Sequence, residues 1–92
     1  MSDAKKIVVV LQDRPDEALR MALGLTLEGD EISVINVGGA VPASDDNEMN
    51  IMALGEFDAK LMSVNETDGD FETVSMQDVP AKLAEFDHVL PY

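Results

Sequence analysis

The stretch that decides the fold is KIVVVLQDRPDEALRMALGLTLEGDEISVINVGGAV, from Lys6 to Val41. It begins with the apolar run 7–11, which is typical of a β-strand covered on both faces. An aspartate and then a proline follow, so we predict a helix over 14–28 that stops at Gly29. The alternating run 31–37 predicts a second strand. A strand, a helix and a strand in this order predict a right-handed unit with parallel strands.

The rest of the chain continues this alternation in shorter segments. A loop containing Gly38 and Gly39 precedes a helix that we expect to begin at Ser44 or Asp45. Its expected buried stripe consists of Met49, Met52, Ala53 and Phe57. Further strands are predicted at 59–64, 71–76 and 88–90, with a short helix at 78–85. We therefore predict one α/β domain over 1–92, a flavodoxin-like three-layer sandwich with a mainly parallel sheet of four to five strands.

Composition excludes several classes of function. The 92 residues include 19 acidic and 6 basic side chains, so the formal net charge is −13. That charge argues against binding to nucleic acid or to an anionic membrane. The absence of Cys removes disulfides, thiolate catalysis and iron–sulfur ligation. The sequence shows neither a signal peptide nor a membrane span, so a cytoplasmic protein is expected.

The sequence offers no cofactor or metal site of a familiar kind. The loop 12–17 holds a proline and three acidic side chains, which disfavours a phosphate. An EF-hand in the acidic segment 65–72 would place Val64 and Ser75 at ligand positions that require carboxylates. His88 is the only histidine and lacks the partners that a metal site or a catalytic triad requires. We expect no cofactor and no bound metal.

The carboxyl ends of the predicted strands are where a small ligand is expected, because open α/β sheets bind ligands there. The candidate ligand-binding residues at this edge are Gln12, Asp13, Gly38, Gly39, Asn65 and Glu66. Their acidic character favours a cation or a neutral polar ligand. Asp13 acting as a lone general base would have no supporting group, so no catalytic residue is predicted.

Two segments of the chain resemble the DsrE/DsrF-like sulfur-relay family. The first is Lys6 to Val41, with its run ALRMALGLTLEG, and the second is the closing stretch FETVSMQDVPAKLAEFDHVL at 71–90. The resemblance implies an α/β sandwich that assembles as trimers or hexamers. Family members carry a persulfide on a cysteine after the third strand, a region that reads Ser63-Val64-Asn65-Glu66 here. Without a thiol this chain cannot carry persulfide sulfur by itself.

The resemblance and the composition lead to two alternative expectations. The first is a non-catalytic DsrE-like protein, either a homo-oligomer with a trimer favoured, or an accessory subunit in intracellular sulfur trafficking with a thiol-bearing partner. The second is a small-molecule or cation-binding domain that is not an enzyme. For the oligomer, the helix 14–28 carries apolar residues around more of its circumference than one core contact needs. We expect Met21 and Leu25 to form its interface.

Overall fold

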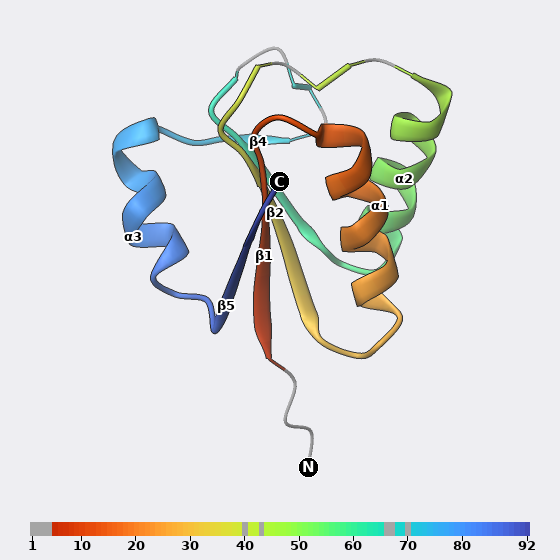
Figure 1. Cartoon of the computed structure of the whole chain (residues 1–92), viewed down its shortest axis with the longest axis horizontal. Helices are drawn as coiled ribbons and strands as arrows, with labels where there is room; N and C mark the ends of the chain where they lie inside the picture. The colour runs from red at the N-terminus through yellow and green to blue at the C-terminus, as the bar shows by residue number, and fades with distance from the viewer. Residues whose placement is uncertain (1–4, 40, 43, 66–67, 70) are drawn as a thin grey trace.

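Strands and helices follow one another along the chain in the order that the sequence predicts, with alternation as far as β3 and then two consecutive strands (Figure 1). The computed structural model describes residues 5–39, 41–42, 44–65, 68–69 and 71–92. The strands are β1 (Lys6–Leu11), β2 (Glu31–Asn36), β3 (Lys60–Ser63), β4 (Glu72–Thr73) and β5 (His88–Pro91). The helices are α1 (Pro15–Thr26), α2 (Asp45–Glu56), the 3₁₀ turn η1 (Met76–Asp78) and α3 (Val79–Leu83).

The five strands form one sheet in the order β4-β3-β2-β1-β5, and all neighbouring strands are parallel. The central pair runs from Lys6 opposite Glu31 to Leu11 opposite Asn36. The chain winds from β1 toward β4 and then crosses back to β5, so the direction of winding reverses between β1 and β5. The predicted flavodoxin-like α/β fold with a parallel sheet is confirmed.

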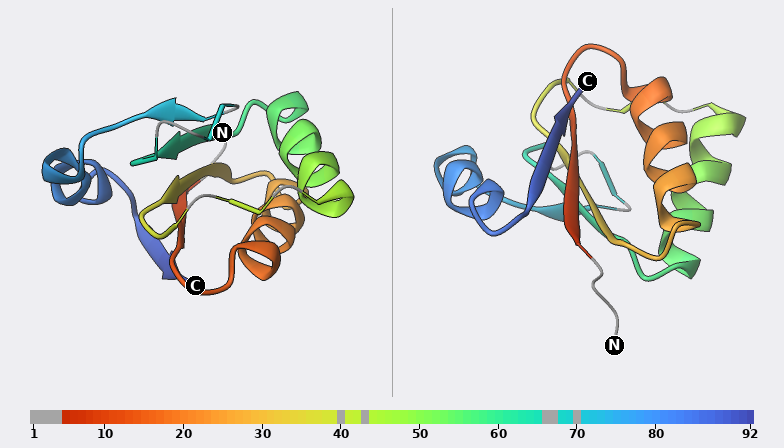
Figure 2. Two further views of the ribbon diagram at one scale, coloured as in Figure 1. Left: turned by 90° about the horizontal axis from the view of Figure 1, so that it is seen from above. Right: turned by 60° about the horizontal axis from the view of Figure 1, so that its bottom comes forward.

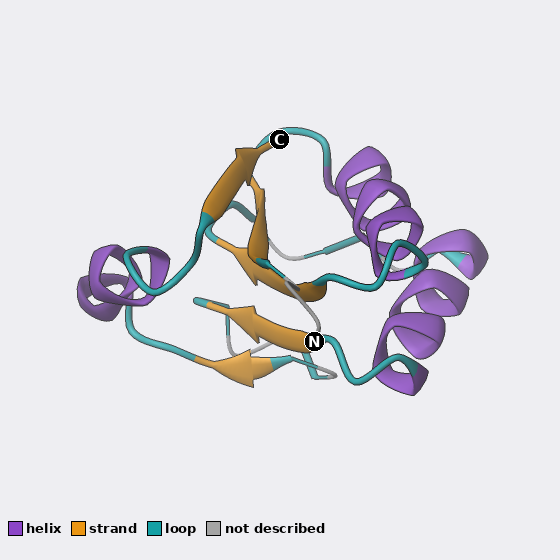
Figure 3. Cartoon of the chain, turned by 90° about the horizontal axis from the view of Figure 1, so that it is seen from below, coloured by secondary structure: helices purple, strands orange, loops and turns teal. Residues whose placement is uncertain are grey.

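Helices cover both faces of this sheet, which produces the three layers seen in Figures 2 and 3. α1 and α2 lie side by side on one face, over a core that includes Val9, Leu11 and Val34. η1 and α3 lie on the opposite face, over a second core that includes Val8 and Val10. Successive residues of β1 therefore enter different cores, which is why this strand is a continuous apolar run.

Local signals account for the helix ends. Pro15 begins α1, with Asp16 and Glu17 in its first turn, where acidic side chains favour the helix dipole. Gly29 has a φ of 89°, a left-handed conformation that suits glycine after a helix. The Ser44 hydroxyl caps α2 by accepting a hydrogen bond from the Asn47 backbone N–H at 3.1 Å.

The expected buried stripe of α2 is wrong. Met49, Met52 and Phe57 are 64%, 67% and 51% exposed, and the buried residues of the helix are Asn47 and Leu54. Asn47 turns inward because its side-chain amide donates to Asp16 Oδ1 at 2.8 Å and to the Pro42 carbonyl at 2.9 Å. These bonds satisfy the Asn47 amide N–H groups, while its Oδ1 is buried without a hydrogen-bond partner among the described residues. With Asn47 on the buried face, Met49 and Met52 face solvent.

Two segments near the end of the chain also differ from expectation. The predicted strand 71–76 pairs only over Glu72–Thr73, because β4 follows β3 for just two residues at the edge of the sheet. The predicted helix 78–85 is helical only over α3, and the 3₁₀ turn η1 directly precedes it. α3 has only five residues, so it covers a small part of its face of the sheet.

Candidate functional site

A buried polar network closes the carboxyl edge of the sheet. Asn36 ends β2 and Ser63 ends β3, and both side chains are buried with Asp68, which lies in the loop after β3. One carboxylate oxygen of Asp68 accepts hydrogen bonds from Asn36 Nδ2 at 2.8 Å and from the Ser63 hydroxyl. The other oxygen accepts from the backbone N–H of Val41 at 2.9 Å. The network joins two strand ends to two loops.

The predicted ligand-binding residues are distributed around this network. Gln12, Gly38 and Asn65 come together, because Asn65 Nδ2 donates to the Gly38 carbonyl at 2.7 Å and Gly38 lies against the Gln12 backbone. A side chain at Gly38 would place its Cβ 2.5 Å from the Gln12 carbonyl oxygen. The Gly39 carbonyl accepts from Asn36 Nδ2 at 2.8 Å. The polar groups of these residues are therefore hydrogen-bonded to one another. The ligand-binding site predicted at these residues stays a prediction.

Asp13 and Glu66 stand apart from that group. The backbone N–H groups of Asp13 and Arg14 donate to the Tyr92 carbonyl oxygen at 3.1 and 2.9 Å. These donors lie where the winding reverses between β1 and β5, the usual place for an anionic ligand in such sheets. These two N–H groups, which could otherwise bind a phosphate, are therefore already hydrogen-bonded within the chain. Glu66 lies outside the described residues.

The outer side of α1 carries an apolar groove. Its volume is about 460 Å³, and its apolar part is formed by Met21, Gly24, Leu25 and Tyr92. Three charged residues border it, Glu17 and Arg20 from α1 and Glu28 from the turn after the helix. The groove exists because the sheet meets α1 through Ala18, Leu19 and Ala22, which leaves this flank uncovered by the described residues. Met21 and Leu25, the predicted interface residues, lie together in it.

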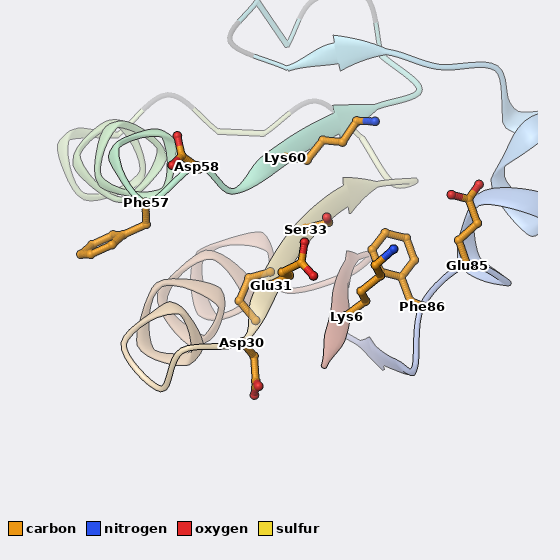
Figure 4. Close-up of a pocket in the computed structure, with 10 residues that line it drawn as sticks. Lys6, Asp30, Glu31, Ser33, Phe57, Asp58, Lys60, Glu85 and Phe86 are labelled. Atoms are coloured by element: carbon orange, nitrogen blue, oxygen red, sulfur yellow. The ribbon is translucent and has the colours of Figure 1, made fainter. Parts of the chain in front are cut away.

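A second hollow, of about 370 Å³, opens at the amino edge of the sheet below α3 (Figure 4). Lys6, Ser33 and Lys60 line it from three neighbouring strands, and Glu85 and Phe86 line it from the segment after α3. Figure 4 shows Lys60 and Glu85 pointing from opposite sides toward the space between the sheet and α3. The hollow is open here because α3 is too short to reach the amino ends of the strands.

Among the described residues, no group of three or more histidine and acidic side chains is placed to hold a metal ion. His88 is exposed in the edge strand β5. Within the same residues the structure contains one ion pair, Arg14 with Glu17 at 3.4 Å. No helix in the described part of the chain combines the length and the apolar character of a membrane span.

Comparison of the chain with protein-family models, with curated proteins and with solved structures finds no match. The resemblance to the DsrE/DsrF-like family is therefore neither supported nor contradicted by a related protein.

Sequence reasoning missed three residues that organise the carboxyl edge. Asn36 and Ser63 fall within the predicted strands 31–37 and 59–64, and Asp68 falls within the acidic segment 65–72, so none of them was predicted to form a site. A polar residue at the end of an otherwise buried strand is a usable signal, and Asn36 has it. Asp68 lies in an acidic segment that gives no local signal of burial, and it is buried where Asn36, Ser63 and the Val41 backbone N–H donate to its carboxylate.

Proposed function

We propose that the chain is a non-catalytic binding module that acts by self-association through the outer side of α1. The observation that carries the proposal is the groove formed by Met21, Gly24, Leu25 and Tyr92. A helix that needs only to cover its own sheet requires an apolar stripe of about 100°. α1 meets that need with the buried Ala18, Leu19 and Ala22. Leu25 packs in part against the same core, and Met21 remains 42% exposed.

Burial of the groove contributes part of the free energy that association requires. Complete burial of a methionine or leucine side chain contributes about 1.5–3 kcal/mol. Met21 is 42% exposed and Leu25 is half-buried, so each contributes part of that amount. The net charge of −13 opposes association, and salt weakens this repulsion over about 8 Å at physiological ionic strength. We therefore expect assembly to strengthen as salt is raised.

Light scattering coupled to size exclusion tests the proposal at low and high salt. Met21→Lys is expected to reduce the assembly to a 10.0 kDa monomer, and Leu25→Lys to act in the same direction. Met52→Lys is the matched control, because it makes the same change of residue and charge at an exposed position on α2. A wild-type monomer under all conditions, or equal effects of Met21→Lys and Met52→Lys, would contradict the proposal.

A role in sulfur trafficking is the more specific form of this proposal, and it depends on the family resemblance alone. In that role the module would be an accessory subunit bound to a thiol-bearing sulfur-transfer protein. The region that corresponds to the family's cysteine ends β3 at Ser63, whose hydroxyl is bound to Asp68. A pull-down with the tagged chain should recover such a partner, and recovery of the chain alone would leave only self-association.

The second candidate function is binding of a small polar molecule. The hollow at the amino edge of the sheet is the better candidate for this site than the carboxyl edge. Lys6 and Lys60 reach this hollow from β1 and β3, and neither is within ion-pair distance of a described carboxylate. A thermal-shift screen should compare small dicarboxylates, polyamines and divalent cations. Stabilisation that Lys60→Ala removes and Lys82→Ala retains would support this function, and no stabilisation by any compound would reject it.

A further inference from the structure

α2 presents two methionines to solvent on one side of the helix. Met49 and Met52 are 64% and 67% exposed and lie three residues apart, so they are neighbours on the helix surface. Beside Met52, a groove of about 420 Å³ lies between α2 and β3, with Ile51 and Leu61 half-buried along it. Gly55 also lines the groove, and a Cβ there would meet nothing within 4 Å. The described residues therefore leave this groove and both methionines uncovered.

Acidic side chains surround these methionines, and α2 contains no basic residue. Asp45 lies one turn before Met49. Glu48 and Glu56 lie one turn before and one turn after Met52, so each is its neighbour on the helix surface. Glu56 is in the last turn, where an acidic side chain opposes the helix dipole. Its charge does not stabilise the helix, and the exposed methionines do not stabilise the core.

We propose that this face of α2 is a docking surface for a basic amphipathic helix of another protein. The apolar side of such a helix enters the groove between α2 and β3 and packs against the methionines, whose flexible side chains adapt to partners of varied shape. Its lysines and arginines face the carboxylates. These extend from Asp45 to Glu56, a length of about 17 Å along the helix axis.

Other occupants fit this face less well. A second copy of the chain has 6 basic against 19 acidic side chains, and no described helix carries more than one basic residue. An extended peptide would have to pair with β3. Among the described residues, β4 already pairs with Met62 and Ser63, which leaves only Lys60 and Leu61 of the strand. Two residues provide few of the main-chain hydrogen bonds that hold an added strand.

The docking surface on α2 is separate from the groove on α1. The α1 groove lies beside Tyr92, which follows β5, whereas the α2 groove lies beside β3 on the other side of the sheet's central pair (Figure 2). Salt screens the attraction between the acidic face and a basic helix, so docking weakens as salt is raised. Self-association is expected to strengthen under the same conditions. The response to salt therefore distinguishes the two interactions.

Fluorescence anisotropy with a labelled synthetic peptide tests the docking surface. The probe is a helical peptide of about 18 leucine and lysine residues with its leucines on one face, and the control has the same composition in scrambled order. The amphipathic peptide should bind about tenfold more tightly than the scrambled one, and more weakly as salt is raised. Equal binding of the two would mean general charge attraction and would overturn the inference. Tighter binding of an extended peptide of alternating valine and lysine would overturn it as well.

Two pairs of variants locate the site, with circular dichroism to show that each variant is folded. Met52→Lys should raise the dissociation constant of the amphipathic peptide about tenfold or more, and Met21→Lys should leave it unchanged. Glu56→Gln should raise it about threefold. Glu72→Gln removes the same charge and should have no effect, because Glu72 pairs with Met62 on the face of the sheet that α3 covers.

The oligomeric state of the same variants separates this inference from the proposed self-association. Met52→Lys should lose the peptide and keep the wild-type assembly, whereas Met21→Lys should lose the assembly and keep the peptide. A peptide that binds Met52→Lys as well as wild type would overturn the docking surface and leave self-association standing. A wild-type monomer that binds the peptide with the expected pattern of variants would support the docking surface and contradict self-association.

Discussion

The carboxylate of Asp68 accounts for how the loops at the carboxyl edge are held. It accepts hydrogen bonds from Asn36 Nδ2, the Ser63 hydroxyl and the Val41 backbone N–H. Asp68→Ala leaves these buried donors unpaired, and an unpaired buried polar group costs about 1–3 kcal/mol. We expect a loss of about 2–4 kcal/mol in the free energy of unfolding, measured by urea denaturation. Glu56→Ala, an exposed acidic residue of α2, should change it by less than about 0.5 kcal/mol.

The two adjacent glycines of the loop after β2 should respond differently to alanine. A Cβ at Gly38 meets the Gln12 carbonyl oxygen at 2.5 Å, whereas a Cβ at Gly39 meets nothing within 4 Å. Gly38→Ala forces the backbone of one loop away from the other, and we expect a loss of about 1–3 kcal/mol. Gly39→Ala should be close to neutral by the same thermal or urea measurement. Equal effects at the two positions would mean that the loops do not pack as described.

At the scale of elements, the strands were the most predictable part of the chain. β1 and β2 are confirmed because five of the six residues in each are buried, which leaves a strong pattern in the sequence. α2 was predicted with the right start and the wrong buried face, because Asn47 is held inside by partners on other elements. β4 was predicted over 71–76 and pairs only over Glu72–Thr73. An alternating segment does not show how many of its residues pair with a neighbouring strand.

The end of α2 supplies a prediction about helix termination. Asp58 follows the helix with a φ of 62°, a left-handed conformation that a non-glycine residue adopts at a cost. Asp58→Gly removes that cost and should raise the free energy of unfolding by about 0.5–1 kcal/mol. Asp58→Val, a β-branched side chain, should lower it by more than about 1 kcal/mol in the same experiment. A stabilising effect of valine would contradict the described helix end.

At the scale of the whole molecule, the candidate site was less predictable than the fold. The carboxyl edge was the expected ligand site by a general rule, yet its polar groups are joined to one another by hydrogen bonds. The hollow at the amino edge lies below α3, which was predicted as a short helix over 78–85 and is shorter still, at Val79–Leu83. The groove on α1 was anticipated, because the excess of apolar residues on one helix is visible without knowledge of the neighbouring elements.

The net charge of −13 should make the stability of the monomer depend on salt. Like charges on a compact chain repel one another, and added salt screens that repulsion. Salt also weakens attractive pairs, but the described residues contain only the exposed pair of Arg14 with Glu17, so repulsion dominates. We expect the free energy of unfolding to rise by about 1 kcal/mol between 0.05 and 1 M NaCl, which is an increase of about 4–8 °C in Tm.

This measurement should use the Met21→Lys variant, because association would otherwise add to the apparent stability. A triple variant with Glu48, Glu56 and Glu72 changed to glutamine provides the control, since these three side chains are exposed. It removes three negative charges, so its Tm at low salt should be higher and its dependence on salt smaller. A Tm that falls as salt rises would mean that attractive charge pairs outweigh the repulsion, and the acidic composition would then stabilise the fold rather than oppose it.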